Sequence, residues 1–180
     1  MTKAVYAGSF DPIHSGHIDV LRRAVKTFGG VTLLIADNPS KTYKLLPEQR
    51  IKWIREILDD AGVNGVTIDY LKDQFLADYC REHEITHIVK GLRNGTDLEN
   101  EMAQEWYTKK MNESVETIYF TCEEKKRYLS SSSIKSMTIL KRTEFITYLK
   151  KINMIDGMSD EKFEDYLWKI YTTYGTKKDS

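Results

Sequence analysis

The grouping best suited to chemistry is the segment Gly8–His17, GSFDPIHSGH, in which His14 and His17 stand three positions apart. A short β-branched run precedes it and an amphipathic run follows it, so we expect it to join a strand to a helix. Two imidazoles on one side of a helix N-terminus, beside free backbone N–H groups, could stabilise charge on phosphate oxygens. The segment therefore suggests nucleotidyl or phosphoryl transfer, although either histidine alone could be a surface or capping residue.

Five short β-branched or apolar runs could form the strands that position this segment. They are Val5–Ala7, Val31–Ala36, Val66–Ile68, His87–Val89 and Glu116–Phe120. Nearly continuous apolar runs are typical of parallel strands that are buried on both faces. Because helical patterns separate the runs, the sequence predicts βαβ crossovers and a doubly wound α/β sheet of five parallel strands. Ligands of such a sheet bind beyond the carboxyl ends of its strands, where the Gly8–His17 segment would lie.

The helical patterns are apolar stripes with steps of three and four residues. The stripes are Ile18, Leu21, Val25 and Phe28; Ile51, Ile54 and Leu58 after Pro47; Phe75, Tyr79 and Cys80; and Leu98, Met102 and Trp106. After Ser136 the strand signals stop, and helices are predicted over residues 137–153 and 159–172. We therefore expect one domain over residues 1–136 and a helical extension over residues 137–180 that packs on it. Trp53, Trp106 and Trp168 are expected to anchor the core or an interface.

Composition excludes several classes of protein. The 180 residues include 27 Lys+Arg and 27 Asp+Glu, and this balance argues against a nucleic-acid-binding protein. Cys80 and Cys122 lack CxxC spacing, and His83 and His87 lack ligand spacing, so we expect reduced thiols and no protein-held metal. A polar N-terminus and the lack of a long apolar run predict a soluble, cytoplasmic protein without a membrane segment.

The segment Gly8–His17 resembles the (H/T)xGH signature of the nucleotidyltransferase superfamily. Four further segments resemble the phosphopantetheine adenylyltransferase family in the same order: Asn38–Lys41, Lys90–Arg93 (KGLR), Asp97–Met102 and Leu129–Lys135 (LSSSSIK). The resemblance spans residues 3–136 and implies a Rossmann-like nucleotidyltransferase fold. It also implies transfer of AMP from ATP to 4′-phosphopantetheine, which gives dephospho-coenzyme A and pyrophosphate in coenzyme A biosynthesis.

The resemblance also implies roles for individual residues. His17 would stabilise the transition state with His14 beside it, Lys41 would hold the acceptor phosphate, and Arg93 would bind the β- and γ-phosphates. The expected ATP contacts are Ser9, Phe10, His17, Gly91, Leu92, Arg93, Glu101, Leu129, Ser130, Ser131 and Ser132, and the expected acceptor contacts are Ser9, Lys41, Leu76 and Lys90. Mg²⁺ is expected to be held mainly by the phosphates, and the family implies a homo-oligomer, most often a hexamer.

Two departures from the family pattern leave the acceptor open. The family generally has threonine at the position of His14, and a histidine there is similar to the nicotinate or nicotinamide mononucleotide adenylyltransferases. Lys90 replaces an arginine on the acceptor side, and lysine cannot make the same bidentate contact. The KGLR and LSSSSIK segments favour phosphopantetheine. A catalytically weak nucleotide sensor is a further alternative, whereas a nicotinamide dehydrogenase is disfavoured because no GxGxxG follows the first strand.

Overall fold

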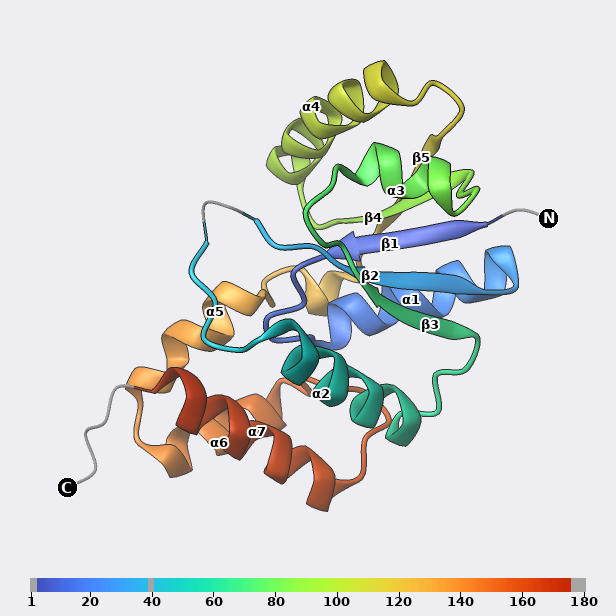
Figure 1. Ribbon diagram of the computed structural model, residues 1–180. Helices are drawn as coiled ribbons and strands as arrows, with labels where there is room; N and C mark the ends of the chain where they lie inside the picture. The colour runs from blue at the N-terminus through green and yellow to red at the C-terminus, as the bar shows by residue number, and fades with distance from the viewer. Residues whose placement is uncertain (1–2, 39–40, 176–180) are drawn as a thin grey trace.

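The computed structural model describes residues 3–38 and 41–175 (Figure 1). Its strands are β1 Ala4–Gly8, β2 Val31–Ile35, β3 Val66–Tyr70, β4 His87–Leu92 and β5 Glu116–Thr121. Its α-helices are α1 Ser15–Phe28, α2 Pro47–Asp60, α3 Leu76–Glu82, α4 Gly95–Met111, α5 Ser131–Ser136, α6 Arg142–Lys151 and α7 Asp160–Tyr174, with 3-10 turns at η1 Glu124–Lys126 and η2 Met137–Ile139. The five predicted strands are thus all present.

The five strands form one parallel sheet in the order β3-β2-β1-β4-β5. The chain leaves β1 toward β2 and β3 on one side and later returns to place β4 and β5 on the other side. The strand order therefore reverses between β1 and β4, and a crevice opens there beyond the carboxyl ends of the two strands. This arrangement confirms the predicted doubly wound sheet and places Gly8, at the end of β1, beside the switch point.

Helices cover both faces of the sheet (Figure 1). On one face α3 and α4 lie together, and the smaller apolar cluster, which includes Val5, Leu34 and Ile88, is buried beneath them. On the other face α1, α2 and the C-terminal helices share one large cluster that includes Ile18, Leu33 and Leu167. The C-terminal extension is therefore packed into the same core as the sheet.

The helix expected over residues 137–153 is the main error in the predicted elements. The chain turns through η2 and then becomes extended at Leu140 and Lys141, so that α6 begins only at Arg142. The Tyr171 hydroxyl donates a hydrogen bond of 3.1 Å to the Leu140 carbonyl oxygen. This tertiary contact gives the Leu140 carbonyl oxygen a partner 31 positions away, at the point where the helix is broken.

The stripe expected on α4 is present in the sequence but does not enter the core. No residue of α4 is buried, and Met102 and Trp106 are 55% and 58% exposed. Trp106 is therefore not a core anchor, whereas Trp53 packs partly buried against the large cluster. The apolar side chains of α4 form an exposed surface instead.

Candidate active site

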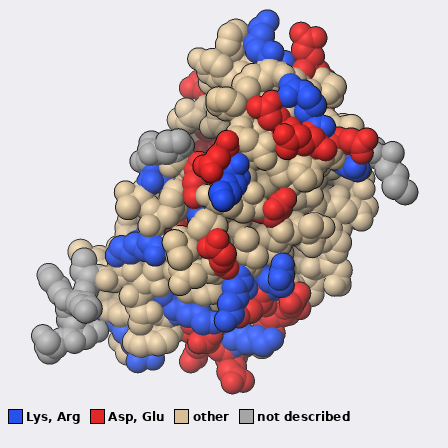
Figure 2. Space-filling model, viewed as in Figure 1, with Lys and Arg blue, Asp and Glu red and all other residues tan. Residues whose placement is uncertain are grey.

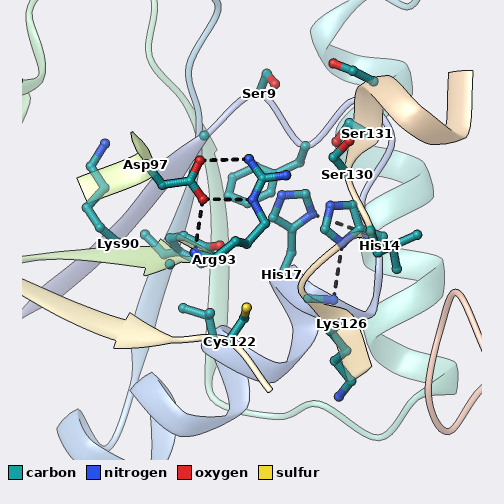
Figure 3. A pocket seen from close by; sticks show the side chains of 18 of the residues that line it. Ser9, His14, His17, Lys90, Arg93, Asp97, Cys122, Lys126, Ser130 and Ser131 are labelled. Atoms are coloured by element: carbon teal, nitrogen blue, oxygen red, sulfur yellow. Dashed lines mark hydrogen bonds and ion pairs between the residues drawn. The ribbon is translucent and has the colours of Figure 1, made fainter. Parts of the chain in front are cut away.

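A cavity of about 270 Å³ lies at the switch point, between the ends of β1 and β4 and the start of α5 (Figure 3). Among the predicted site residues, it is lined by Ser9, Phe10, His14, His17, Lys41, Lys90, Gly91, Arg93, Glu101, Leu129, Ser130, Ser131 and Ser132. Outside it, Lys and Arg mingle with Asp and Glu over the face that Figure 2 shows. The charged residues that line the cavity are Lys41, Lys90, Arg93 and Lys126, together with Asp97 and Glu101.

His14 and His17 lie against each other at the start of α1. Their ring centroids are 3.7 Å apart, and a side chain at Gly16 would meet the His14 ring at 3.1 Å. His14 is the N-cap, and its Nδ1 accepts from the Gly16 N–H at 3.2 Å, while His17 Nδ1 accepts from the His14 N–H at 3.2 Å. A neutral imidazole that accepts at Nδ1 carries its proton on Nε2. Both rings can therefore donate from Nε2.

Burial keeps both imidazoles neutral. It lowers the pKa of His14 well below its usual value, with further lowering by His17 and Arg93. It also lowers the pKa of His17 from 6.5 to about 3, and the positive charges of Arg93 and Lys41 add to the effect. Neutral donors with a fixed tautomer suit the stabilisation of a phosphorane-like transition state, because they need no proton transfer before the reaction.

The depressed His17 pKa predicts how stability depends on pH. Between about pH 6.5 and 3 the unfolded chain binds a proton that the folded chain excludes, so acidification favours unfolding. We expect His17→Gln to remove this contribution, which is at most about 1.4 kcal/mol per pH unit within that window. Urea unfolding of wild type and variant at pH 7.5, 6.0 and 5.0 tests this. The free energy of unfolding of the wild type should fall more steeply on acidification, and parallel curves would contradict the prediction.

Arg93 extends over His17 from the end of β4, as Figure 3 shows. Its Nε and Nη2 donate to the two carboxylate oxygens of Asp97 at 2.9 and 3.0 Å. Asp97 is itself fixed at the start of α4, where its N–H donates to the Asn94 side chain at 2.9 Å. The pair uses only part of the guanidinium, which leaves its other N–H groups for phosphate oxygens.

Lys90 and Lys41 supply further positive charge. Lys90 Nζ lies 2.7 Å from a carboxylate oxygen of Glu101. Lys90 was predicted as an acceptor contact and Glu101 as an ATP contact, and both line the cavity. Lys41 lies beyond the end of β2, and its N–H donates to the Asn38 carbonyl oxygen at 2.9 Å. Pro39 and Ser40 of the predicted Asn38–Lys41 segment are outside the described residues.

The serine run begins α5 and combines capping with lining. The Ser130 hydroxyl accepts from the Ser133 N–H at 3.0 Å, as an N-cap does. The Ser131 hydroxyl donates to the Pro12 carbonyl oxygen at 2.8 Å. This bond joins α5 to the segment Gly8–His17, which we call the histidine loop. The Ser131 and Ser132 N–H groups precede the first intrahelical hydrogen bond and are not the ones that Ser130 caps, so they can serve an anion.

Two predicted contacts lie elsewhere. Leu76 lines a small neighbouring cavity that Lys90 and Glu101 also reach, and Leu92 is not among the residues that line the main cavity. Cys80 and Cys122 are both free, as expected. Among the described residues no group of three or more His, Cys, Asp or Glu side chains could hold a metal ion.

Four residues that shape the site were not among the predicted contacts. Asp97, Cys122 and Lys126 line the cavity, and Asp97 could have been found as the acid one turn after Arg93. Arg50 is 2% exposed and is the largest fully buried side chain. Its Nη1 donates to the Ser9 carbonyl oxygen at 3.1 Å, and its Nη2 lies 2.7 Å from an oxygen of Asp37. Arg50 thus ties together the loops that follow β1 and β2.

Comparison with known proteins agrees with this geometry. A family model described as cytidylyltransferase-like matches residues 5–137. The phosphopantetheine adenylyltransferase of Paenarthrobacter aurescens is 36% identical over 140 residues, which are 78% of this chain and 82% of that protein. The phosphopantetheine adenylyltransferase of Dictyoglomus turgidum is 38% identical over 137 residues, which are 76% of this chain and 84% of that protein. The chain belongs to the phosphopantetheine adenylyltransferase family. The resemblance predicted from the sequence is thus confirmed.

Solved structures add a likeness of fold. A bifunctional NMN adenylyltransferase/ADP ribose pyrophosphatase from Francisella tularensis matches with a TM-score of 0.64 and 19% identity, over 96% of this chain and 52% of that one. The Plasmodium falciparum nicotinic acid mononucleotide adenylyltransferase complexed with NaAD matches with a TM-score of 0.63 and 16% identity, over 96% and 98% of the two chains. This family member therefore has the nucleotidyltransferase fold. No helix within its described residues is long and apolar enough to cross a membrane.

Proposed function

We propose that this chain transfers AMP from ATP to 4′-phosphopantetheine, giving dephospho-coenzyme A and pyrophosphate. The observation that carries the proposal is the cavity at the switch point, which two neutral imidazoles line together with Lys41, Lys90 and Arg93. We infer the identity of the acceptor from family membership. The histidine and cationic side chains that line the cavity suit the charges of the reacting phosphates. An oxygen of the acceptor phosphate attacks the α-phosphorus, and the bond from that phosphorus to the β-bridging oxygen breaks as pyrophosphate leaves.

In this reaction the protein positions charge and moves no proton. The attacking phosphate oxygen is already ionised, so a general base is not required. His17 donates from Nε2 to the α-phosphate as negative charge builds there, and His14 donates beside it. Lys41 neutralises and holds the acceptor phosphate, while Arg93 binds the β- and γ-phosphates that become the leaving group.

A divalent cation, Mg²⁺ in our proposal, would enter with the triphosphate as part of the nucleotide substrate. Both carboxylates that line the cavity are paired with cations, Asp97 with Arg93 and Glu101 with Lys90. This donor set suits an ion held mainly by phosphate oxygens, where it would neutralise charge on the triphosphate. One structure of similar fold, a bifunctional NMN adenylyltransferase/ADP ribose pyrophosphatase from Francisella tularensis, is complexed with AMP and a manganese ion.

A mononucleotide adenylyltransferase is the second candidate, and the presence of His14 favours it. The deciding experiment offers MgATP to the purified protein with phosphopantetheine, nicotinamide mononucleotide or nicotinate mononucleotide, and measures pyrophosphate release. A reaction without acceptor corrects for ATP hydrolysis, and excess chelator should abolish release. Release with phosphopantetheine alone supports the proposal. Pyrophosphate release with a mononucleotide alone would assign the enzyme to NAD synthesis. No release with any of the three acceptors would make the nucleotide sensor the better hypothesis.

We also propose that the protein is a homo-oligomer, as family membership implies. The apolar residues Met102, Trp106 and Tyr107 of α4 are more than half exposed, which suits a surface that a second copy covers. Sedimentation velocity is expected to give a mass several times 21.0 kDa, and Trp106→Glu should shift it toward the monomer. A monomeric wild type would refute this part of the proposal.

A further inference from the structure

The C-terminal helices contact the histidine loop itself. Three alternate residues of the loop, Asp11, Ile13 and Ser15, each bond to a residue beyond the region that the family model matches. The Ser15 N–H donates to the Met154 carbonyl oxygen at 2.6 Å. The other two bonds come from tyrosines of α7, and each ends on one atom of the loop.

Tyr166 and Tyr174 provide these two bonds. The Tyr166 hydroxyl donates to the Ile13 carbonyl oxygen at 3.1 Å, and the Tyr174 hydroxyl donates to one carboxylate oxygen of Asp11. The two tyrosines are 3% and 9% exposed, so water does not compete freely for either bond. The second bond joins residues 163 positions apart in the chain.

Asp11 is the buried end of this arrangement. Asp11 is 1% exposed. The carboxylate oxygen that does not accept from Tyr174 lies 2.9 Å from Lys135 Nζ of α5. A buried carboxylate is stable only when its oxygens have charged or hydrogen-bonding partners. Tyr174 and Lys135 together satisfy Asp11, so the side chain can stay inside and hold the start of the loop in place.

Of the residues between these anchors, His14 lines the cavity. His14 lies between Ile13 and Ser15 and has an extended backbone, with φ −150° and ψ 173°. On either side of His14, the Ile13 carbonyl oxygen and the Ser15 N–H are bonded to Tyr166 and Met154. His14 itself lines the cavity, and its N–H fixes His17 Nδ1.

From this geometry we propose that Tyr174 and Tyr166 of α7 are positioning residues for His14 and His17. The C-terminal extension thus serves the reaction by fixing the loop from behind, and does more than complete the core. The inference rests on the proposed function for its kinetic test and on the described contacts for its spectroscopic one. Neither tyrosine lines the cavity, so both act through the loop.

The test compares Tyr174→Phe and Tyr166→Phe with Tyr171→Phe. Tyr171 belongs to the same helix, and its hydroxyl also bonds to a backbone carbonyl oxygen, that of Leu140, which lies outside the histidine loop. Each substitution removes one hydroxyl and keeps the ring. We expect Tyr174→Phe and Tyr166→Phe to lower kcat by about 10–10²-fold, with the KM for ATP changed less than about threefold. Tyr171→Phe should keep the wild-type kcat.

A second readout does not depend on the acceptor. The imidazole ¹⁵N shifts of histidine-labelled protein report tautomer and hydrogen bonding, and His83 and His87 provide internal references outside the cavity. The signals of His14 and His17 should move in Tyr174→Phe and Tyr166→Phe and stay in place in Tyr171→Phe. If one α7 variant fails to fold, the other still decides the question.

The outcomes separate this inference from the proposed function. Unmoved His14 and His17 signals with wild-type kcat would overturn the positioning role, even if the melting temperature falls. If wild-type protein transfers AMP to none of the three acceptors, the proposed function fails. The imidazole shifts then decide the positioning role alone.

Discussion

His17→Ala is expected to lower kcat by about 10²–10³-fold while the KM for ATP changes less than about threefold. The Nε2 donor of His17 meets its full partner only when charge builds on the α-phosphate, so its loss raises the transition state more than the bound substrate. Burial and the Arg93 and Lys41 charges keep the imidazole neutral, since its pKa is lowered to about 3. The loss should therefore be the same at pH 6 and pH 8, as measured by pyrophosphate release.

The matched control is His83→Ala. His83 follows α3 and stacks on Tyr79 with ring centroids 4.1 Å apart, and it does not line the cavity. This variant should turn over as the wild type does. A His17→Ala protein that kept full turnover would contradict the role of His17 in stabilising the transition state.

The fold could be predicted because its signals are local. Runs such as Val31–Ile35 are apolar on both faces, and the helical stripe from Ile18 to Phe28 follows the loop directly. Once five such runs alternate with helices, the handedness of βαβ crossovers leaves few topologies. Ser9, His17, Gly91 and Ser130 could be placed together for the same reason, because each lies near the carboxyl end of a strand of one sheet or near the start of the helix after it.

Other features of the structure depend on contacts that no local pattern shows. Nothing near Asp11 in the sequence indicates a bond to Tyr174, and nothing near Leu140 indicates that Tyr171 would end a helix there. The apolar stripe of α4 shows a second limit of sequence-based prediction. Its spacing predicts an apolar face, but spacing does not determine whether that face is buried. Arg50 reads as a surface residue of an amphipathic helix, yet Ser9 and Asp37 make its burial possible.

The second large effect is expected at Arg93. Arg93→Ala should lower kcat/KM for ATP by about 10²-fold or more, because each hydrogen bond between charged groups contributes about 1.5–3 kcal/mol. Arg93→Lys should recover only part of this loss. A lysine keeps the charge, but it cannot hold both oxygens of Asp97 and a phosphate in one plane. The pyrophosphate inhibition constant should rise in both variants while the KM of the acceptor changes little.

Arg81→Ala controls for the loss of an arginine–aspartate pair. Arg81 pairs with Asp78 at 2.6 Å on the surface of α3 and does not line the cavity, so kcat/KM should stay at the wild-type value. Asp97→Asn tests the orientation of the guanidinium, since it keeps the shape of the partner and removes its charge. If Asp97 only orients Arg93, this variant should lose less than Arg93→Ala in kcat/KM for ATP. Equal losses would mean that the Arg93 guanidinium contributes nothing to kcat/KM once its Asp97 partner has lost its charge. The Arg93–Asp97 pair would then act as one unit on the triphosphate.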